Sequence, residues 1–189
     1  MVDRPKVESL SPEVSWLNDY PCSTSLTKFC SFSCWEQTSA DLVAAINRFR
    51  RLHCSPGVLV SEKLNTLANK WATTIAALGE AKKDNSSTNG QLICKYSGED
   101  SIVTACVSKW YSCITDFDWA EPKLSNLSSP FTQLVWKSNK QVGVGFAKGD
   151  GSEVYVVVLL EPGQNGTGKV RDNVLPATGK PAEERVKLA

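Results

Sequence analysis

The chain has 189 residues, of which 41% are hydrophobic and 22% are charged, and its formal net charge is +1. This length and composition are typical of a single globular domain with its own hydrophobic core. Charges of both signs are interspersed, so we expect no nucleic-acid partner, and no apolar run approaches the roughly 20 residues that a transmembrane helix needs.

Residues 1–37 differ from the rest of the chain because they show little hydrophobic periodicity. They contain three prolines and three of the seven cysteines: Pro5, Pro12, Pro21, Cys22, Cys30 and Cys34. We interpret this segment as an N-terminal extension in the form of a partly ordered arm; the alternative is that its thiols connect it to the body of the protein or to another chain. Its first residues contain neither the apolar core of a signal peptide nor the glycine that myristoylation requires, so we expect neither signal unless a leader has been removed.

A first helix is predicted to begin at Thr38, because Thr38-x-x-Asp41 resembles a capping box. Its buried stripe follows steps of four, three and four residues: Leu42, Ile46, Phe49 and His53. The only histidine of the chain therefore faces the core. Pro56 and Gly57 end the helix.

Two more helices are predicted over residues 61–78 and 102–114, separated by a polar loop over residues 80–91. The first has an apolar face and ends at Gly79, and this face consists of Leu64, Leu67, Ala68, Trp71, Ile75 and Leu78. The second directs Val103, Cys106, Val107, Trp110 and either Cys113 or Ile114 inward. Cys106 and Cys113 lie about 10.5 Å apart along such a helix, which is too far for a disulfide.

The pattern then changes to that of strands, which we predict over residues 132–137, 142–147 and 154–160. Helices followed by an antiparallel sheet indicate an α+β fold. Residues 177–189 are interpreted as a polar tail outside the domain.

Several motifs, in order, resemble those of the CAP superfamily of cysteine-rich secretory, antigen 5 and pathogenesis-related proteins. They are Asn47-Arg-Phe-Arg-Arg-Leu-His53, Lys109-Trp-Tyr-Ser112, Phe131-Thr-Gln-Leu-Val-Trp136, Glu161-Pro-Gly-Gln-Asn165 and Asn173-Val-Leu-Pro176. The last resembles the Golgi-associated plant pathogenesis-related branch. We assign a CAP domain to residues 38–176.

The resemblance implies a three-layer α-β-α sandwich with a central antiparallel sheet and a cleft. It also implies a non-enzymatic protein that binds a lipid, a sterol or a protein partner, with peripheral membrane contact as one mode. The resemblance leaves two cellular locations open for this protein. Members of the Golgi-associated branch are intracellular and membrane-peripheral, whereas most members of the superfamily are secreted.

In the family, two histidines and two glutamates commonly converge in the cleft, where they hold a divalent metal. Here the resemblance places His53 at the first histidine and Pro130 at the second, whereas Cys113 and Cys94 stand at or near the two glutamates. At most His53 remains as a vestigial metal ligand. The resemblance therefore implies a degenerate metal site and no cofactor.

Three interpretations of the cysteine replacements remain open. A Cys94–Cys113 disulfide would close a loop of about 19 residues and contribute about 3 kcal/mol. Alternatively, the two thiols fill space beside a core histidine. Thirdly, His53, Cys94 and Cys113 form a soft-metal site for zinc or copper, or His53 pairs with Cys94 or Cys113 to give a reactive thiolate; either would make this a thiol- or metal-dependent protein.

Surface features suggest where a ligand would bind. Phe117, Trp119 and Leu124 lie in an irregular segment and are candidate lipid contacts, although such residues also commonly cap a core. A basic surface for anionic headgroups would consist of Lys137, Lys140 and Lys148. Glycosylation sequons occur at Asn85, Asn126 and Asn165 and would matter only in a secretory protein.

Overall fold

The computed structural model describes residues 32–164 and 170–177. Its elements are α1 (Phe32–Leu52), β1 (Leu59–Val60), α2 (Glu62–Leu78), β2 (Gly90–Tyr96), α3 (Ile102–Ser112), the 3₁₀ helix η2 (Cys113–Asp116), α4 (Ser129–Val135), β3 (Gln141–Lys148), β4 (Val154–Glu161) and α5 (Val170–Asn173). Most of the predicted N-terminal extension and C-terminal tail lies outside the described residues, and the proposed domain division stays a prediction.

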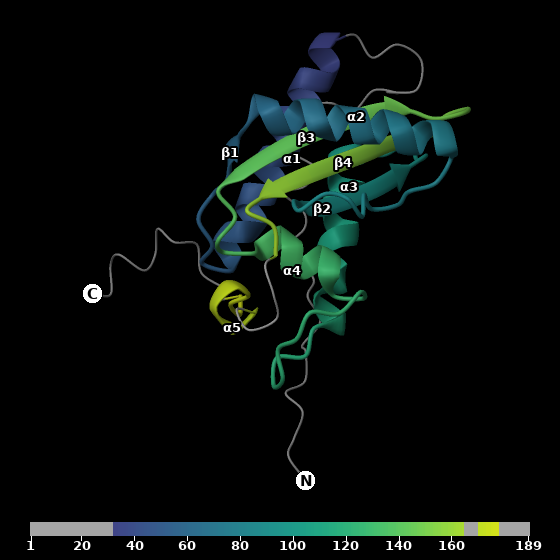
Figure 1. The fold of residues 1–189 in the computed structure, drawn as a ribbon. Helices are drawn as coiled ribbons and strands as arrows, with labels where there is room; N and C mark the ends of the chain where they lie inside the picture. Colours follow the sequence, from purple (N-terminus) through teal and green to yellow (C-terminus); the bar gives the residue numbers. More distant parts are fainter. Residues whose placement is uncertain (1–31, 165–169, 178–189) are drawn as a thin grey trace.

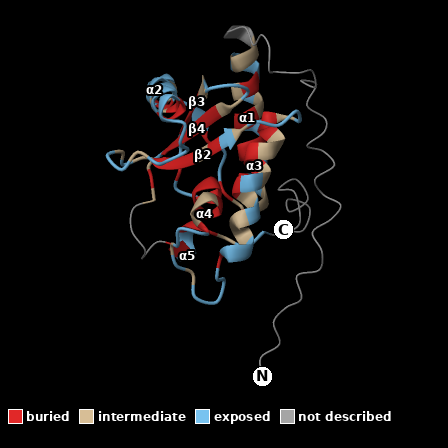
Figure 2. Ribbon diagram, turned by 90° about the vertical axis from the view of Figure 1, so that its right-hand side faces the viewer, coloured by how far each residue is buried: buried red, intermediate tan, exposed pale blue. Residues whose placement is uncertain are grey.

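The elements form three layers, and the middle layer is a sheet with the strand order β1-β3-β4-β2 (Figure 1). The long strands β2, β3 and β4 pair antiparallel, and β1 adds two residues parallel to β3. Figure 2 shows the buried strands between α2 on one side and α1 with α3 on the other. The predicted α+β sandwich is confirmed, with a sheet that is mixed because of β1.

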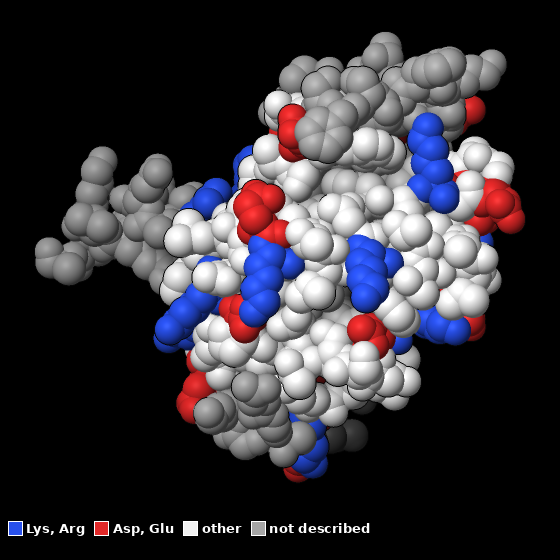
Figure 3. Space-filling view, turned by 45° about the horizontal axis from the view of Figure 1, so that its top comes forward, with Lys and Arg blue, Asp and Glu red and all other residues white. Residues whose placement is uncertain are grey.

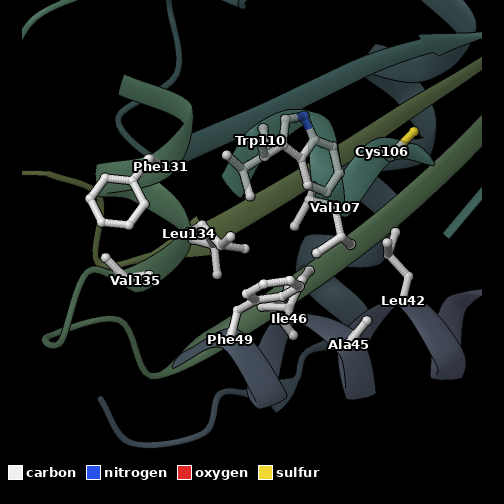
Figure 4. Packing of buried hydrophobic residues seen from close by; sticks show 14 of the residues in the cluster. Leu42, Ala45, Ile46, Phe49, Cys106, Val107, Trp110, Phe131, Leu134 and Val135 are labelled. Atoms are coloured by element: carbon white, nitrogen blue, oxygen red, sulfur yellow. The ribbon is translucent and has the colours of Figure 1, made fainter. Parts of the chain in front are cut away.

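The sheet has a hydrophobic core on each of its two faces. Strand β4 contributes side chains to both cores, which explains its continuous apolar run. Tyr155, Val157 and Leu159 pack toward α2. Val156, Val158 and Leu160 point to the opposite face, where they join the core that α1, α3 and α4 complete (Figure 4). A strand covered on both faces needs apolar residues at every position, because successive side chains alternate between the faces.

Helix α2 approaches β3 closely because two glycines of the strand face it. A Cβ atom added to Gly143 would lie 2.2 Å from the carbonyl carbon of Leu64, and one added to Gly145 would lie 2.2 Å from that of Ala68. Real Cβ atoms do not approach other atoms so closely, and only glycine therefore allows this helix-to-strand distance.

The outer edge of β3 is protected by the same helix. Asn65 accepts a hydrogen bond from the amide of Val144 at 2.9 Å, and Asn69 accepts one from the amide of Phe146 at 3.1 Å. These side chains accept hydrogen bonds from N–H groups of β3 that the two-residue strand β1 is too short to pair with. Exposed strand edges promote unwanted pairing with other chains, and the two asparagines remove donors that such pairing would use.

The helix predictions are largely confirmed, with differences at the ends. Within the described residues helix α1 begins at Phe32, so the predicted start at Thr38 is wrong; Thr38 instead donates to the carbonyl of Cys34 at 2.8 Å, a bond made inside a helix. Helix α2 ends as predicted, with Gly79 in the left-handed conformation at φ 68°. The predicted inward positions Leu67 and Leu78 are exposed.

The strand predicted over residues 132–137 is wrong, because residues 132–135 belong to helix α4 and residues 136–137 follow its end. Residues 131–135 are all buried, so the segment shows no amphipathic period that would indicate a helix. Pro130 suits the first turn, where a helix needs no amide hydrogen from that residue. Strand β2 was not predicted, and its first two residues fall inside the predicted loop.

The fully buried Arg50 connects α1 to the end of α4. Its Nε donates to the carbonyl of Pro56 at 2.9 Å. Its Nη1 donates to those of Leu134 and Trp136 at 3.1 and 2.9 Å, and its Nη2 donates to that of Asn139 at 3.2 Å. Burial lowers the pKa of Arg50 to about 10, which leaves the guanidinium charged at neutral pH. The planar fork thus donates to the Leu134 carbonyl at the end of helix α4 and to carbonyls of the adjoining turns.

We expect Arg50→Lys to lower the free energy of unfolding by about 2–4 kcal/mol, because one ammonium group cannot reach four carbonyls that diverge around a planar fork. Urea denaturation followed by tryptophan fluorescence measures the loss. The exposed neighbour Arg51 offers a matched control, and Arg51→Lys should stay within about 0.5 kcal/mol of the parent protein. Equal stability of the two variants would contradict the assigned role of Arg50.

Candidate functional site

The predicted cleft residue His53 is completely buried at the end of α1, and both of its ring nitrogens have partners. Nδ1 lies 2.6 Å from the carbonyl oxygen of Leu175, and Nε2 lies 3.1 Å from the hydroxyl of Tyr111. A carbonyl only accepts, so Nδ1 carries the proton and donates. In a neutral ring Nε2 then accepts from the Tyr111 hydroxyl.

The surroundings of His53 favour this neutral form. Burial lowers its pKa, and the hydrogen bond to the Leu175 carbonyl raises it by a smaller amount. The neighbouring rings of Tyr111 and Phe131 present their edges, at centroid distances of 5.7 and 5.3 Å. The histidine thus joins α1, α3 and the C-terminal segment as a neutral core residue.

A continuous series of aromatic contacts leads from this histidine to the surface. Tyr111 contacts Phe49 at 4.3 Å and Phe131 at 5.8 Å between ring centroids. Phe131 in turn contacts Phe117 at 5.8 Å, and Phe117 contacts Trp119 at 4.7 Å in an edge-to-face arrangement. These rings occupy the region where the resemblance predicted a polar metal cleft.

The predicted Cys94–Cys113 disulfide is wrong, because Cys94 forms a disulfide with Cys106. Cys94 lies on β2 and faces the core, and Cys106 lies directly above it on the buried side of α3, with a Cα–Cα distance of 5.7 Å. Cys113 follows Cys106 by two helical turns. The observed bond spans 12 residues and should contribute about 3 kcal/mol by the entropy of loop closure.

The predicted soft-metal site is also contradicted, because Cys94 has no thiolate to offer while it forms this disulfide. Cys113 keeps its thiol, which donates to the carbonyl of Lys109 at 3.6 Å. Burial raises the pKa of Cys113, and Asp116 raises it further. Within the described ranges, no three His, Cys, Asp or Glu side chains gather closely enough to hold a metal ion.

Pro130, the fourth predicted cleft residue, lies in the first turn of α4 and is only partly buried. It precedes Phe131, whose ring contacts His53. The structure therefore brings His53 near α4, as the resemblance implies, but the contacting side chain is aromatic. Proline supplies no metal ligand at this position.

The three predicted lipid-contact residues differ in exposure. Phe117 is buried and Leu124 is half-buried against the core, whereas 39% of Trp119 is exposed. Leu127, which the sequence did not single out, is 70% exposed in the same segment. Trp119 is therefore the member of the predicted set that a ligand can reach, with Leu127 as an apolar residue of the same loop.

The predicted basic surface is not one patch. Lys140 precedes β3 and Lys148 ends it, so a strand separates them by about 26 Å. On the face that Figure 3 shows, basic and acidic side chains are scattered among uncharged residues. An anionic ligand would therefore find no concentrated positive charge on that face.

The sequence did not indicate the partners of His53. Tyr111 belongs to the motif Lys109-Trp-Tyr-Ser112, but no sequence pattern indicates which residue its hydroxyl contacts. The Leu175 carbonyl is a main-chain group, which any residue would supply. Such contacts become visible only when distant segments are placed together.

Comparison with known proteins agrees with this architecture. Residues 43–160 match the CAP family, described as the cysteine-rich secretory protein family. The chain belongs to the CAP family.

This CAP domain is 27% identical over 145 residues to the human Golgi-associated plant pathogenesis-related protein 1, which covers 75% of the chain and 94% of that protein. It is 30% identical over 146 residues to Protein PRY2 of Saccharomyces cerevisiae strain S288c, which covers 73% of the chain but only 41% of that longer protein.

Among solved structures, the Hookworm Platelet Inhibitor superposes with a TM-score of 0.61 at 16% identity, covering 90% of each chain. This likeness supports the CAP fold. No helix among the described residues of the CAP domain combines the length and apolar character that crossing a membrane requires.

We expect the free energy of unfolding to fall as the pH drops below about 6.5, the ordinary pKa of histidine, because the folded state holds His53 neutral while the unfolded chain takes up a proton. The slope from this residue is at most about 1.4 kcal/mol per pH unit and levels off below the folded pKa. Urea denaturation across this pH range measures it, and His53→Phe should remove this part of the slope.

Because the chain contains one histidine, proton NMR titration reports its pKa directly. We expect a midpoint below 6.5 in the folded protein. A midpoint at or above that value would contradict the neutral, doubly hydrogen-bonded ring.

Proposed function

We propose that this CAP domain is a non-enzymatic binding protein for a lipid or sterol, and that the surface around Trp119 makes the contact. The observation that supports it best is the packing of Trp119 against its neighbours. Its ring is partly exposed, and it packs edge-to-face on the buried Phe117. A tryptophan held in place by its neighbours loses little conformational freedom when it binds.

The chemistry of this surface suits an amphipathic ligand. Indole rings combine a large apolar area with one polar N–H group, and tryptophan is common where proteins meet the interface of a bilayer. Since the predicted basic residues do not cluster, we propose that apolar contact dominates over attraction to anionic headgroups.

The loop that carries Trp119 is attached to the body of the domain. Arg171 of α5 donates to the carbonyl of Ala120 at 3.0 Å. Phe117 and Phe131 support the loop from below, at a centroid distance of 5.8 Å. We therefore propose a largely pre-formed contact surface, on which binding needs little rearrangement of the backbone.

We further propose that the metal site of the family is degenerate here. A metal at His53 would have to displace the Tyr111 hydroxyl or the Leu175 carbonyl from a ring nitrogen. Pro130 offers no ligand, and the thiol of Cys113, which has a raised pKa, donates to the carbonyl of Lys109. The residues present therefore do not fit a divalent metal, and the same engaged imidazole is poorly suited to act as a general base.

We expect Trp119→Ala to weaken binding to vesicles of phosphatidylcholine with ergosterol or cholesterol by about tenfold, because Trp119 is the aromatic residue of the proposed surface that is exposed to solvent. Vesicle sedimentation measures the affinity. Leu78→Ala is a matched control, since Leu78 is 55% exposed on helix α2 and lies outside the proposed surface.

Two results would overturn the lipid proposal. The first is that the parent protein sediments with none of these vesicles, or with vesicles that contain a fatty acid or phosphatidylserine. The second is that Trp119→Ala and Leu78→Ala weaken binding equally. Failure to bind any vesicle would leave a protein partner as the function to pursue for the same surface.

For the degenerate metal site, we expect no stoichiometric zinc or copper in protein dialysed against either ion and then against buffer. Inductively coupled plasma mass spectrometry measures the metal content. His53→Phe should give the same background value. One ion per chain that disappears in His53→Phe would overturn the proposal and restore a metal function to this site.

A further inference from the structure

Two of the three sequons lie in the described residues, and both present their asparagine to solvent. Asn85 begins Asn-Ser-Ser in the loop between α2 and β2, and Asn126 begins Asn-Leu-Ser in the turn before α4. Both side chains are exposed. The third sequon, at Asn165, lies outside the described residues.

The loop around Asn85 is shaped by the preceding residue. The carboxylate of Asp84 accepts hydrogen bonds from the amide and from the hydroxyl of Ser86, at 2.9 and 2.6 Å. This local turn encloses Asn85 between the two partners, so its side chain stands at the outside of the bend. The main-chain amide of Asp84 donates a hydrogen bond to Oε1 of the buried Gln91 at 2.8 Å.

The turn around Asn126 is built in a similar way with hydroxyl groups. The amide of Ser128 donates to the hydroxyl of Ser125 at 3.1 Å, and the two hydroxyls lie 2.7 Å apart. Ser128 is buried, whereas Asn126 and Leu127 between the partners are exposed. Two unrelated loops thus display an acceptor asparagine at the apex of a stabilised turn.

Other asparagines of the domain are used differently. Five of them direct side-chain atoms into hydrogen bonds with the protein, and none of these five stands in a sequon: Asn47, Asn65, Asn69, Asn139 and Asn173. Within the described part of the chain, Asn85 and Asn126 make no such side-chain bond. A substituent on their amide nitrogen would therefore break no hydrogen bond of the fold.

The disulfide supplies an independent observation. Cys94 and Cys106 are bonded in the centre of the domain. Structural disulfides form in oxidising compartments and are rare in the cytosol. The same secretory route contains the enzymes that attach oligosaccharides to sequons.

We propose that Asn85 and Asn126 each carry an N-linked oligosaccharide. In the reaction, the amide nitrogen Nδ2 forms a bond to the anomeric carbon of the oligosaccharide. The donor is a polyprenyl-diphosphate-linked oligosaccharide, whose bond from that carbon to the phosphate oxygen breaks. The amide loses one proton and the polyprenyl diphosphate leaves with the electron pair, so no oxidant or reductant is needed.

The two sites belong to loops that meet at one end of the domain. Lys83, two residues before Asn85, donates from Nζ to the hydroxyl of Ser129 at 2.8 Å, and Ser129 lies three residues after Asn126. The glycans would therefore share the end that carries the N-terminal turn of α4. Because Ser128 is buried in the folded protein, modification of Asn126 has to precede folding.

The test is peptide mass spectrometry of the protein isolated from its own organism. Digestion with peptide N-glycosidase F in heavy-oxygen water converts a glycosylated asparagine to an aspartate that carries the heavy isotope. We expect this label at positions 85 and 126. An unlabelled peptide that covers either position overturns the proposal for that site.

Variants expressed through a eukaryotic secretory pathway provide a second measurement. Asn85→Gln and Asn126→Gln should each remove one step of gel mobility shift, and Ser87→Ala should have the same effect as Asn85→Gln. Asn89→Gln, in the same loop but outside a sequon, is the matched control and should change nothing. A parent protein whose mobility the glycosidase does not alter would contradict the proposal, whatever the result for lipid binding.

Discussion

The placement of helix α4 depends on one buried cation. Arg50 donates to the carbonyls of Leu134, Trp136 and Asn139 on one side and to that of Pro56 on the other. Among the described residues no carboxylate pairs with it. The cost of burying the charge is therefore offset by main-chain dipoles, and this arrangement holds only while α1, α4 and the turn before β3 keep their relative positions. The aromatic residue Phe131 and the loop before it are positioned as a consequence.

His53, which the resemblance to the family places in a cleft, is part of the core in this protein. His53 uses both ring nitrogens within the fold, and Tyr111, Phe131 and Phe117 fill the region with contacting rings. An apolar, well-packed environment favours a neutral imidazole, since a charged group would lose its hydration without gaining a counter-ion. The proposed function accordingly lies at the outer end of this aromatic series, at Trp119.

Periodicity predicted the elements that have one buried and one exposed face. The stripe Leu42, Ile46, Phe49 and His53 is buried as expected, and Gly79 ends α2 because it adopts a left-handed conformation. Periodicity did not indicate α4, whose residues 131–135 are all buried, and it placed the exposed Leu67 and Leu78 on the inward side of α2. The buried residues of α2 are Leu64, Ala68, Ala72, Ile75 and Ala76, and the backbone at Leu64 and Ala68 makes the close contact with the two glycines of β3.

By itself, the sequence determined the fold family and the order of most elements, because these follow from local patterns and residue identity. Only the tertiary structure decided that Cys94 pairs with Cys106, that Tyr111 and Leu175 engage His53, and that Trp119 reaches solvent while Phe117 does not. Each of these facts depends on distances between segments far apart in the chain. Such distances are set by how the helices pack on the sheet, which no local pattern encodes.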